Sequence, residues 1–441
     1  MKIFTFKGGI HPETHKKQTS SLPIVKMPPP KSVILPLAQH TGEPCAAKVK
    51  KGDNVLVGQK IGDADSFITA SLHATVSGAV KDIKAFIDPM GRKLPGIMIE
   101  SDGEDSWDPS ISQTSKTLPA DEITGRVRAC GIVGLGGAAF PTHVKLSPLK
   151  DKKIDTLIIN AVECEPYLTG DHRLMIEYPQ EILKGIEYIS SAIKADRVII
   201  GIEDNKPDAV ELMSTAAQHQ ADIQVVALRT KYPQGSEKQL VEALTKRQIP
   251  SGKLPADAGV AVQNVSTAYA VYEAVEYNKP LIERVVTVTG PNIKHPSNLR
   301  VRFGTSFKDI IEFCGGPNEE IGQLIMGGPM MGIAVPTDEV PVIKGTSGIL
   351  VLREKDVKPC NSYACIRCGK CLDACPMGLA PEYFVDPSLS RNIDTKVENQ
   401  ILNCMECGSC AYVCPARRPL VQWIKIAKAE IKKNQMRNTK Y

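Results

Sequence analysis

The sequence predicts a multidomain α+β protein in which four units of different class follow one another. Three observations support this prediction. The first part consists of short segments punctuated by glycine and proline, the middle alternates strand-like and helix-like segments, and eight of the 13 cysteines lie between residues 365 and 414. A chain of 441 residues, 42% of them hydrophobic, can bury several cores. We define a first unit (1–115), a central unit (116–282), a third unit (283–352) and a cysteine unit (353–441).

Composition and segment patterns limit the partners and the compartment that can be expected for this protein. The formal net charge of +5 argues neither for nor against a nucleic-acid partner, and we predict none. The opening MKIFTFKGGIHP lacks an apolar core of signal-peptide length, and no segment approaches the roughly 18 apolar residues of a membrane span. Five cysteines outside the dense region are expected to be buried thiols, which suits a reducing cytosol: Cys45, Cys130, Cys164, Cys314 and Cys360.

The first unit is predicted to be a small β-sandwich. Lys51–Gly62 and Ser71–Val80 read as short alternating strands joined by glycine turns. Their KxGDxVxxGQ and SGxV patterns resemble the biotinyl/lipoyl carrier fold. The hairpin between them, Asp65–Ile68, lacks the modifiable lysine of that family. We therefore expect a scaffold or docking role instead of a swinging arm.

The central unit is predicted to contain a parallel sheet with right-handed crossovers, because strands and helices alternate. The strand candidates are Asp155–Asn160, Arg197–Ile202 and Asp222–Leu228, and the helix candidates are Pro179–Ser191 and Pro207–His219. Ligands of such sheets bind at the carboxyl ends of the strands. Here these ends are Asn160–Glu165, Glu203–Asn205 and Arg229–Ser236.

A glycine-rich loop, Gly131–Thr142, precedes the first of these strands. Closely spaced glycines let backbone N–H groups approach a phosphate or a flat ring system. The loop is not a Rossmann fingerprint, because it precedes its strand, and no Gly-Lys-Ser/Thr ends it as in a Walker loop. On its own it fits either a nucleotide site or a plain glycine-rich turn.

The third unit reads as a small mixed β domain, with a strand at Arg284–Thr289, a turn at Gly290–Asn292 and a short helix around Phe307–Phe313. It resembles a soluble-ligand-binding β-grasp module. Its residues show no catalytic constellation, so a packing role is the alternative to ligand binding.

The cysteine unit contains two copies of one pattern, C-x-x-C-x-x-C-x-x-x-C-P, beginning at Cys365 and Cys404. This spacing is typical of bacterial ferredoxins, in which three thiolates of each run hold one [4Fe–4S] cluster and the fourth ligates the other cluster. Disulfides and zinc are the alternatives, but zinc needs neither a third evenly spaced cysteine nor the Cys-Pro ending. The predicted ligand sets are Cys365, Cys368, Cys371 and Cys414, and Cys404, Cys407, Cys410 and Cys375.

A lysine-rich helix, Leu420–Lys433, is predicted after the cysteines. A solvated face is one interpretation of its lysines, and docking to an acidic partner or an anionic membrane is the other. Its expected apolar face consists of Val421, Ile424, Ile426, Ala427 and Ile431.

Four ordered segments resemble the FMN- and NADH-binding segments of the NADH-oxidising flavoprotein subunit of complex I. Gly134–Lys145, Asn160–Pro166, Tyr232–Glu237 and Gln263–Thr267 match its GxGGAGFPTxxK, NADExEP, YxxGEE and NNVET patterns. With Gly8–Pro12 and the paired cysteine runs, nearly the whole chain resembles the C subunit of the Rnf electron transport complex, in its short form.

The resemblance implies specific ligand residues. Non-covalent FMN would be lined by Gly134, Gly136, Gly137, Lys145, Asn160, Gln263, Asn264 and Thr267. The flavin and the nicotinamide nucleotide would be surrounded by Glu163, Glu165, Tyr232 and Glu237, with Glu163 and Glu165 as the catalytic residues. Three positions depart from the patterns, Val162 for aspartate, Ser236 for glutamate and Ala139 for glycine. We expect these changes to weaken NADH binding more than FMN binding.

The implied function is electron transfer between NAD(H) and the other subunits of a membrane-embedded, Na⁺- or H⁺-translocating ferredoxin:NAD⁺ oxidoreductase. This chain would be a peripheral subunit on the cytoplasmic face of the membrane, carrying FMN and two [4Fe–4S] clusters and meeting ferredoxin indirectly. Two alternatives stay open at this point. One is a soluble cobalamin reductase of the propanediol-utilisation type, and the other is a cluster-bearing adaptor without NADH activity.

Overall fold

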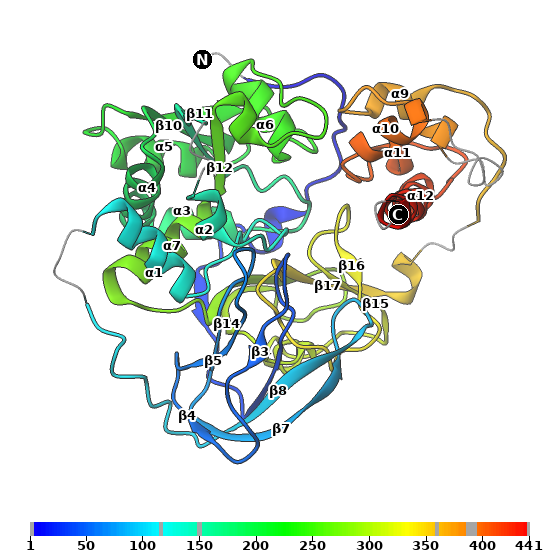
Figure 1. Ribbon diagram of the computed structural model, residues 1–441. Coiled ribbons are helices and arrows are strands. Elements are labelled where there is room, and N and C mark those ends of the chain that lie inside the picture. Colours follow the sequence, from blue (N-terminus) through cyan, green and yellow to red (C-terminus); the bar gives the residue numbers. More distant parts are fainter. Residues whose placement is uncertain (1–3, 114–117, 148–151, 358–360, 385–394, 439–441) are drawn as a thin grey trace.

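Four sheets and a helical carboxyl-terminal region form the protein in the computed structural model, which describes residues 4–113, 118–147, 152–357, 361–384 and 395–438 (Figure 1). This is the multidomain α+β fold that the sequence predicts, while the unit boundaries stay predictions. Cys360 lies outside the described residues. Among the described residues no helix is long and apolar enough to cross a membrane.

The first unit is a sandwich of two antiparallel sheets. Val33 and Leu35 of one strand and Ile97 and Ile99 of its neighbour are buried, with a period of two that directs alternate side chains into the core. One sheet has the order β2 (Ser32–Pro36), β8 (Lys93–Ser101), β7 (Gly78–Ile87) and β4 (Asn54–Val55). The other has the order β3 (Ala46–Ala47), β5 (Lys60–Asp63) and β6 (Leu72–His73).

The central unit has a parallel sheet whose middle strands are buried on both faces, as the apolar run Leu157–Ile159 requires. Its order is β11 (Ile223–Leu228), β10 (Arg197–Glu203), β9 (Thr156–Ala161) and β12 (Val260–Asn264). The sequence analysis missed β12, which pairs with β9 in parallel register. The predicted helix at Pro207–His219 ends earlier, at Ala216.

Helices cover this sheet (Figure 1). Their bounds are α1 (Ala120–Ala129), α2 (Thr142–Lys145), α3 (Gly170–Glu177), α4 (Pro179–Ile193), α5 (Pro207–Ala216), α6 (Glu237–Thr245), η2 (Pro255–Ala258) and α7 (Val265–Tyr277).

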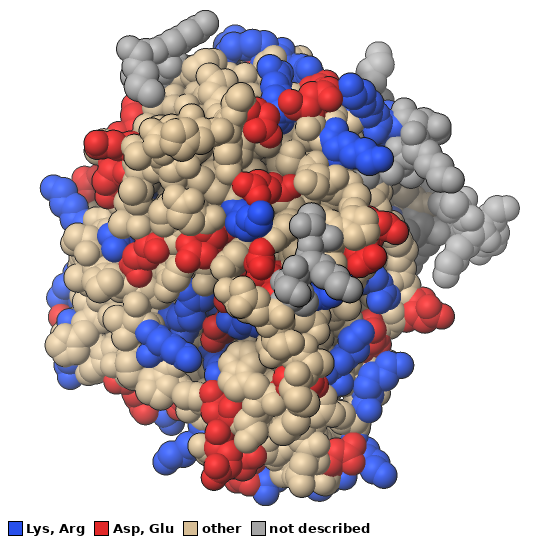
Figure 2. Space-filling view, turned by 90° about the vertical axis from the view of Figure 1, so that its left-hand side faces the viewer, with Lys and Arg blue, Asp and Glu red and all other residues tan. Residues whose placement is uncertain are grey.

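On the face of the molecule shown in Figure 2, acidic and basic side chains are interspersed.

The third unit contains a six-stranded sheet whose first strand comes from the amino-terminal part of the chain. The order is β1 (Ile24–Lys26), β14 (Ser297–Arg302), β13 (Glu283–Thr289), β17 (Gly348–Arg353), β15 (Ile321–Met326) and β16 (Ile333–Ala334). Helix α8 (Phe307–Phe313) buries Phe307, Ile310 and Ile311. Before β1, the chain passes along the central unit, with bridges from Phe4 to Leu228 and from Ile10 to Tyr232, and forms η1 (Lys16–Gln18).

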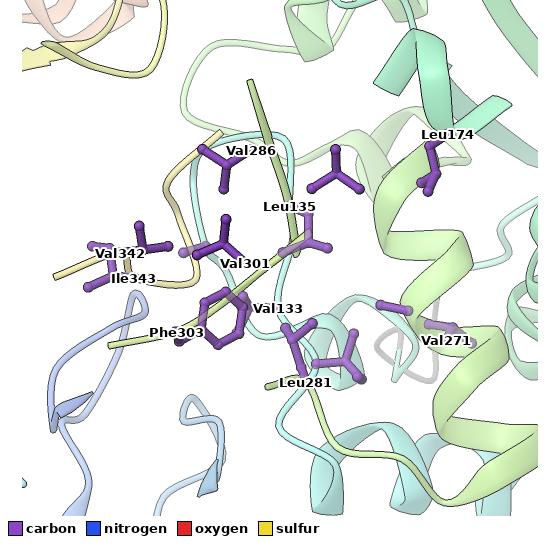
Figure 3. Packing of buried hydrophobic residues seen from close by; sticks show 14 of the residues in the cluster. Val133, Leu135, Leu174, Val271, Leu281, Val286, Val301, Phe303, Val342 and Ile343 are labelled. Atoms are coloured by element: carbon purple, nitrogen blue, oxygen red, sulfur yellow. The ribbon is translucent and has the colours of Figure 1, made fainter. Parts of the chain in front are cut away.

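One hydrophobic core joins the first three units. Figure 3 shows Val133 and Leu135 of the glycine-rich loop among Val301, Phe303 and Val342 of the third unit. The cysteine unit buries a separate cluster of apolar side chains. Its elements are η3 (Glu354–Asp356), α9 (Lys370–Ala374), η4 (Pro381–Phe384), α10 (Thr395–Asn403), α11 (Ser409–Tyr412) and α12 (Leu420–Asn438).

Helix α12 differs in detail from the predicted lysine-rich helix. Its buried face includes Leu420 as well as Ile424 and Ile431, whereas Ile426, expected on that face, is 58% exposed. Lys428 is not a freely solvated lysine, because its ammonium group donates to the carbonyl of Cys404 and pairs with Glu406 at 2.8 Å. This helix therefore supports the loop of the second cysteine run.

Two helix glycines give a matched test of the packing between α4 and α7. A Cβ added at Gly185 of α4 would overlap the carbonyl oxygen of Ala268 in α7, whereas one added at exposed Gly125 of α1 meets nothing within 4 Å. We expect Gly185→Ala to destabilise the protein by about 1–3 kcal/mol, the usual range for overpacking. Gly125→Ala should stabilise it by about 0.5–1 kcal/mol through helix propensity. Thermal unfolding of both variants checks this, and equal shifts would contradict the close helix contact.

Candidate functional site

The glycine-rich loop closes on itself and leaves one glycine facing open space. The amide of Gly134 donates to the carbonyl of Phe140 at 2.8 Å, which closes the loop. Gly137 has a φ of +113°, and a Cβ added there would meet no atom within 4 Å. A backbone bare of side chains beside free space suits the close approach of a flat cofactor. Ala139, which replaces a family glycine, also adopts a positive φ, of +47°.

Two buried cations from the third unit hold this loop. The ammonium group of Lys344 donates to the carbonyls of Gly131 (2.8 Å) and Ser71 (2.9 Å). The guanidinium of Arg284 donates to the carbonyls of Leu135 (2.9 Å) and Lys344 (2.6 Å). Burial lowers the pKa of Lys344 to about 8. Sequence analysis missed both residues, which lie far along the chain from the motif they support.

The structure brings the four flavin-like segments together at the carboxyl edge of the sheet. Asn160 ends the registered part of β9 opposite Asn264 of β12. The side-chain amide of Asn160 donates to the carbonyl of Gly235 at 2.7 Å, and the side-chain oxygen of Asn264 caps α7. The hydroxyl of Thr267 accepts from the amide of Leu135 at 2.9 Å. These polar side chains therefore tie the segments to one another.

Two buried amide side chains here have polar atoms without a protein partner among the described residues. The amide nitrogen of Gln263 and both amide atoms of Gln234 are buried without a hydrogen bond. Buried polar groups are almost always satisfied, so these atoms fit contacts with a bound molecule. Gln263 was predicted to line FMN, whereas Gln234 was not, although it lies inside the matched segment Tyr232–Glu237. The residues present thus fit a flavin.

Two predicted ligand residues bind each other beside this region. The ammonium group of Lys145 lies 2.9 Å from a carboxylate oxygen of Glu237 and 3.2 Å from the carbonyl of Val262. Both side chains are partly exposed. A partly solvated pair can exchange partners when an anionic ligand arrives, because its net stabilisation is small.

The side chains of Glu163, Glu165 and Tyr232 form hydrogen bonds with residues outside the four flavin-like segments. The Glu163 carboxylate accepts from the amides of Asp171 (2.7 Å) and His172 (3.4 Å), at the start of α3. The two oxygens of Glu165 accept from the amides of Met330 (3.1 Å) and Met331 (2.8 Å), in the loop after β15. Burial raises the pKa of Glu165. The hydroxyl of Tyr232 donates to the carbonyl of Cys407 at 2.8 Å.

Asp171 is a further, half-buried carboxylate that was not predicted from the sequence. It accepts from the Asn264 amide at 2.7 Å and from the Ser266 hydroxyl. Burial, with the nearby charge of Glu163, raises the pKa of Asp171 to about 6. A polar Gly-Asp-His run shortly after a strand end was the available signal. Asp171 fixes the orientation of Asn264 at the edge of the flavin-like region.

The two cysteine runs adopt the same local backbone. Arg367 and Glu406, two residues after the first cysteine of each run, both have left-handed φ values, +54° and +60°. Their amides donate to the sulfur of Cys365 and of Cys404, each at 3.4 Å. Repeated N–H···S bonds of this kind stabilise thiolate ligands.

Two cavities are lined by four of these cysteines each, and the ligand sets themselves stay predictions. We call the group that contains the buried residues Cys407 and Cys410 the buried set. We call the group that contains the exposed residues Cys365 and Cys368 the exposed set. The buried set lines one cavity and consists of Cys375, Cys404, Cys407 and Cys410. The exposed set lines the other and consists of Cys365, Cys368, Cys371 and Cys414.

Burial affects the protonation of the thiols in both sets. Within the described ranges, no three His, Cys, Asp or Glu side chains are spaced to hold one metal ion. Burial raises the pKa of Cys410 and, together with Glu382, that of Cys371, in each case to about 12. Ligation by cationic iron supplies the driving force to deprotonate such thiols.

Comparison with known proteins assigns each unit. Residues 4–104 match the RnfC barrel sandwich hybrid domain, and residues 127–273 match the Nuo51 FMN-binding domain. Residues 285–334 match the SLBB domain, and residues 364–417 match the 4Fe-4S dicluster domain. These matches confirm the predicted fold class and the predicted FMN and [4Fe–4S] cofactors.

Curated relatives cover nearly the whole chain. It is 47% identical over 97% of its length to the C subunit of the proton-translocating ferredoxin:NAD(+) oxidoreductase complex of Clostridium ljungdahlii, covering 94% of that protein. It is 45% identical over 98% of its length to the corresponding protein of the Na(+)-translocating complex of Acetobacterium woodii, also covering 98% of that protein. The C subunit of the ion-translocating oxidoreductase complex of Rhodobacter capsulatus is 44% identical over 99% of the chain and 85% of the relative. The chain therefore belongs to the RnfC family, the C subunits of ion-translocating ferredoxin:NAD(+) oxidoreductase complexes.

Proposed function

We propose that this chain passes electrons between NAD(H) and the other subunits of a membrane-bound, ion-translocating ferredoxin:NAD⁺ oxidoreductase, which is the activity its relatives are named for. The observation that carries the proposal is that the flavin-like segments and two four-cysteine cavities occur in one chain, with Tyr232 of the flavin-like region bonded to Cys407 of the buried set. FMN supplies the exchange between two-electron hydride chemistry and the one-electron chemistry of the clusters.

The residues that hold FMN in this proposal are those of the glycine-rich loop and the sheet edge. Gly134, Gly136 and Gly137 offer backbone to the flavin, and Gln263 offers its unpaired amide. Lys145 offsets the phosphate charge by exchanging its bond to Glu237. Asn160, Asn264 and Thr267 keep the surrounding segments in register.

The four residues proposed near the nicotinamide nucleotide divide by their contacts. Glu237 is partly exposed and can accept from a ribose hydroxyl once Lys145 turns to the phosphate. The resemblance implies that Glu163 and Glu165 are catalytic. Their carboxylates already hold α3 and the loop after β15, as the Tyr232 hydroxyl holds the buried set, so we propose instead that these three side chains are positioning residues.

The exposed set is proposed as the exit toward partner subunits, and through them toward ferredoxin. Apolar side chains next to this set are solvent-exposed, among them Ile366 (67%) and Tyr383 (69%), beside basic Arg367 and Lys370. The surface therefore suits a partner with an acidic rim. We place the chain as a peripheral subunit on the cytoplasmic face, since its additional described cysteines are free thiols that suit a reducing compartment.

Anaerobic reconstitution with iron, sulfide and FMN tests the function as a whole. Added NADH should bleach the flavin absorbance, and the clusters should then give EPR signals. A flavin that stays oxidised would favour the alternative of a cluster-bearing adaptor without NADH activity.

Removing a crossing cysteine tests the ligand sets. Cys375→Ala should lose the cluster of Cys404, Cys407 and Cys410 while the cluster of its own run keeps four ligands. Cys414→Ala, the matched variant, should do the reverse. Iron analysis and EPR of anaerobically purified proteins distinguish the two. Wild-type protein that contained zinc, or about four irons in place of the eight of two cubes, would rule out both sets.

A valine at the open glycine tests the flavin loop. Gly137→Val places a β-branched side chain in the free space beside the loop, so FMN occupancy should fall below about a tenth of the wild-type value while both clusters persist. Gly103→Val is the control, because Gly103 also has a positive φ (+81°) and no atom within 4 Å of an added Cβ. Stoichiometric FMN in Gly137→Val would move the flavin site elsewhere.

A double variant tests the route of the electrons. Cys368→Ala combined with Cys407→Ala removes one ligand from each set, so NADH should still bleach the flavin but electrons should not reach the membrane subunits of the assembled complex. The readout is NADH-linked reduction of those subunits. Undiminished transfer would place the clusters off the path.

A further inference from the structure

The buried set is docked on the central unit by several contacts. Besides the bond from Tyr232 to the carbonyl of Cys407, the amide of Gln239 in α6 donates to the carbonyl of Pro376 at 3.2 Å. The Ser236 hydroxyl lies 3.5 Å from the sulfur of Met405. These bonds reach both cysteine runs, because Pro376 follows Cys375 and Met405 follows Cys404.

A segment near the start of the chain lies between these two partners. We call Gly8–Ile10 the strap. Ile10 and Tyr232 exchange both backbone hydrogen bonds, at 2.8 and 2.9 Å, and the amide of Gly9 donates to the carbonyl of Ala374 at 3.0 Å. Ile10, Tyr232, Ala374 and Cys407 also form one buried apolar cluster. The strap is thus bonded to the central unit on one side and to the residue before Cys375 on the other.

The geometry of the strap requires glycine at both of its first positions. Gly8 and Gly9 have φ values of +78° and +79°. A Cβ added at Gly8 would lie 2.7 Å from the carbonyl oxygen of Cys375, and one added at Gly9 would lie 2.7 Å from that of Tyr232. A larger residue at Gly8 would push the crossing cysteine, Cys375, away from the strap, and one at Gly9 would push the strap away from Tyr232 of the central unit. The two glycines therefore fix how closely the cavity of the buried set approaches the flavin-like region.

We propose that the strap is a positioning element that sets the distance between the flavin and the cluster of the buried set. The two electrons that NADH supplies to the flavin consequently pass one at a time to this cluster first. The cluster of the exposed set receives them next. The inference rests on the proposed function. Electron transfer between fixed centres slows steeply with distance, so a small displacement of Cys375 has a large effect on this step alone.

The test compares Gly8→Ala with Gly103→Ala in otherwise intact protein. Both positions have a positive φ, so both variants carry a similar backbone cost. Only Gly8 has a neighbour that an added Cβ would meet. Each protein is purified anaerobically, its iron and FMN are quantified, and it is mixed rapidly with NADH. Flavin absorbance and freeze-quench EPR then follow the flavin and the clusters separately.

Gly8→Ala should keep its iron and FMN and should bleach its flavin at the wild-type rate. Reduction of its clusters should be several-fold slower than in the wild type, because electron transfer slows with the distance between the two centres. Gly103→Ala should match the wild type in every measurement. Tyr232→Phe, which removes only the hydroxyl bonded to Cys407, should slow the same step by a smaller factor.

Three outcomes overturn the proposal. Unchanged cluster reduction in Gly8→Ala would show that the strap does not set the distance. Selective loss of the cluster of the buried set would show that the strap builds this site instead of spacing it. If Gly8→Ala does not fold, unchanged cluster reduction in Tyr232→Phe overturns it. Wild-type protein whose flavin is not reduced by NADH would instead refute the proposed function.

Discussion

Buried cations bonded to backbone carbonyls are the constraint on which the arrangement of the flavin-like region depends. Lys344 and Arg284 hold the glycine-rich loop, and Lys16 donates to the carbonyls of Glu163 and Glu165, each at 2.9 Å. Lys206 does the same for the carbonyl of Val162 at 2.8 Å. A buried charge is tolerated only when its donors are satisfied, so each cation requires its loop to present carbonyl oxygens in one arrangement. The loops are thereby fixed before any cofactor binds.

The cations also explain why the units form one body. Lys344 belongs to the third unit but binds Ser71 of the first and Gly131 of the central unit. Lys16 lies before the first strand of the sandwich in the sequence, yet its ammonium group binds a carbonyl of the central unit. The three units also share one hydrophobic core (Figure 3). The glycine-rich loop is therefore held in place by residues of more than one unit.

The two cysteine sets have the same local backbone but different surroundings. The cavity of the buried set is lined by apolar Phe384 and Ile424, and that of the exposed set by Arg367, Lys370 and Arg418. Burial and nearby charge are the main means by which a protein tunes the potential of an iron–sulfur cluster. Two identical motifs can therefore serve different steps, one next to the central unit and the other toward solvent.

Features that depend on local pattern could be predicted from the residues alone. The cysteine spacing predicted which four side chains share each cavity, and the apolar runs predicted β9, β10 and β11, because ligand loops and buried strands are encoded within a few residues. Contacts between distant residues could not be predicted in this way, because they form only when the chain has folded. The folded chain places β12 beside β9 and pairs β1 with β14. It also brings backbone amides within hydrogen-bonding distance of the carboxylates of Glu163 and Glu165. A carboxylate motif shows an acceptor but not its donor, since the amides of Met330 and Met331 come within reach only when the third unit packs against the central one.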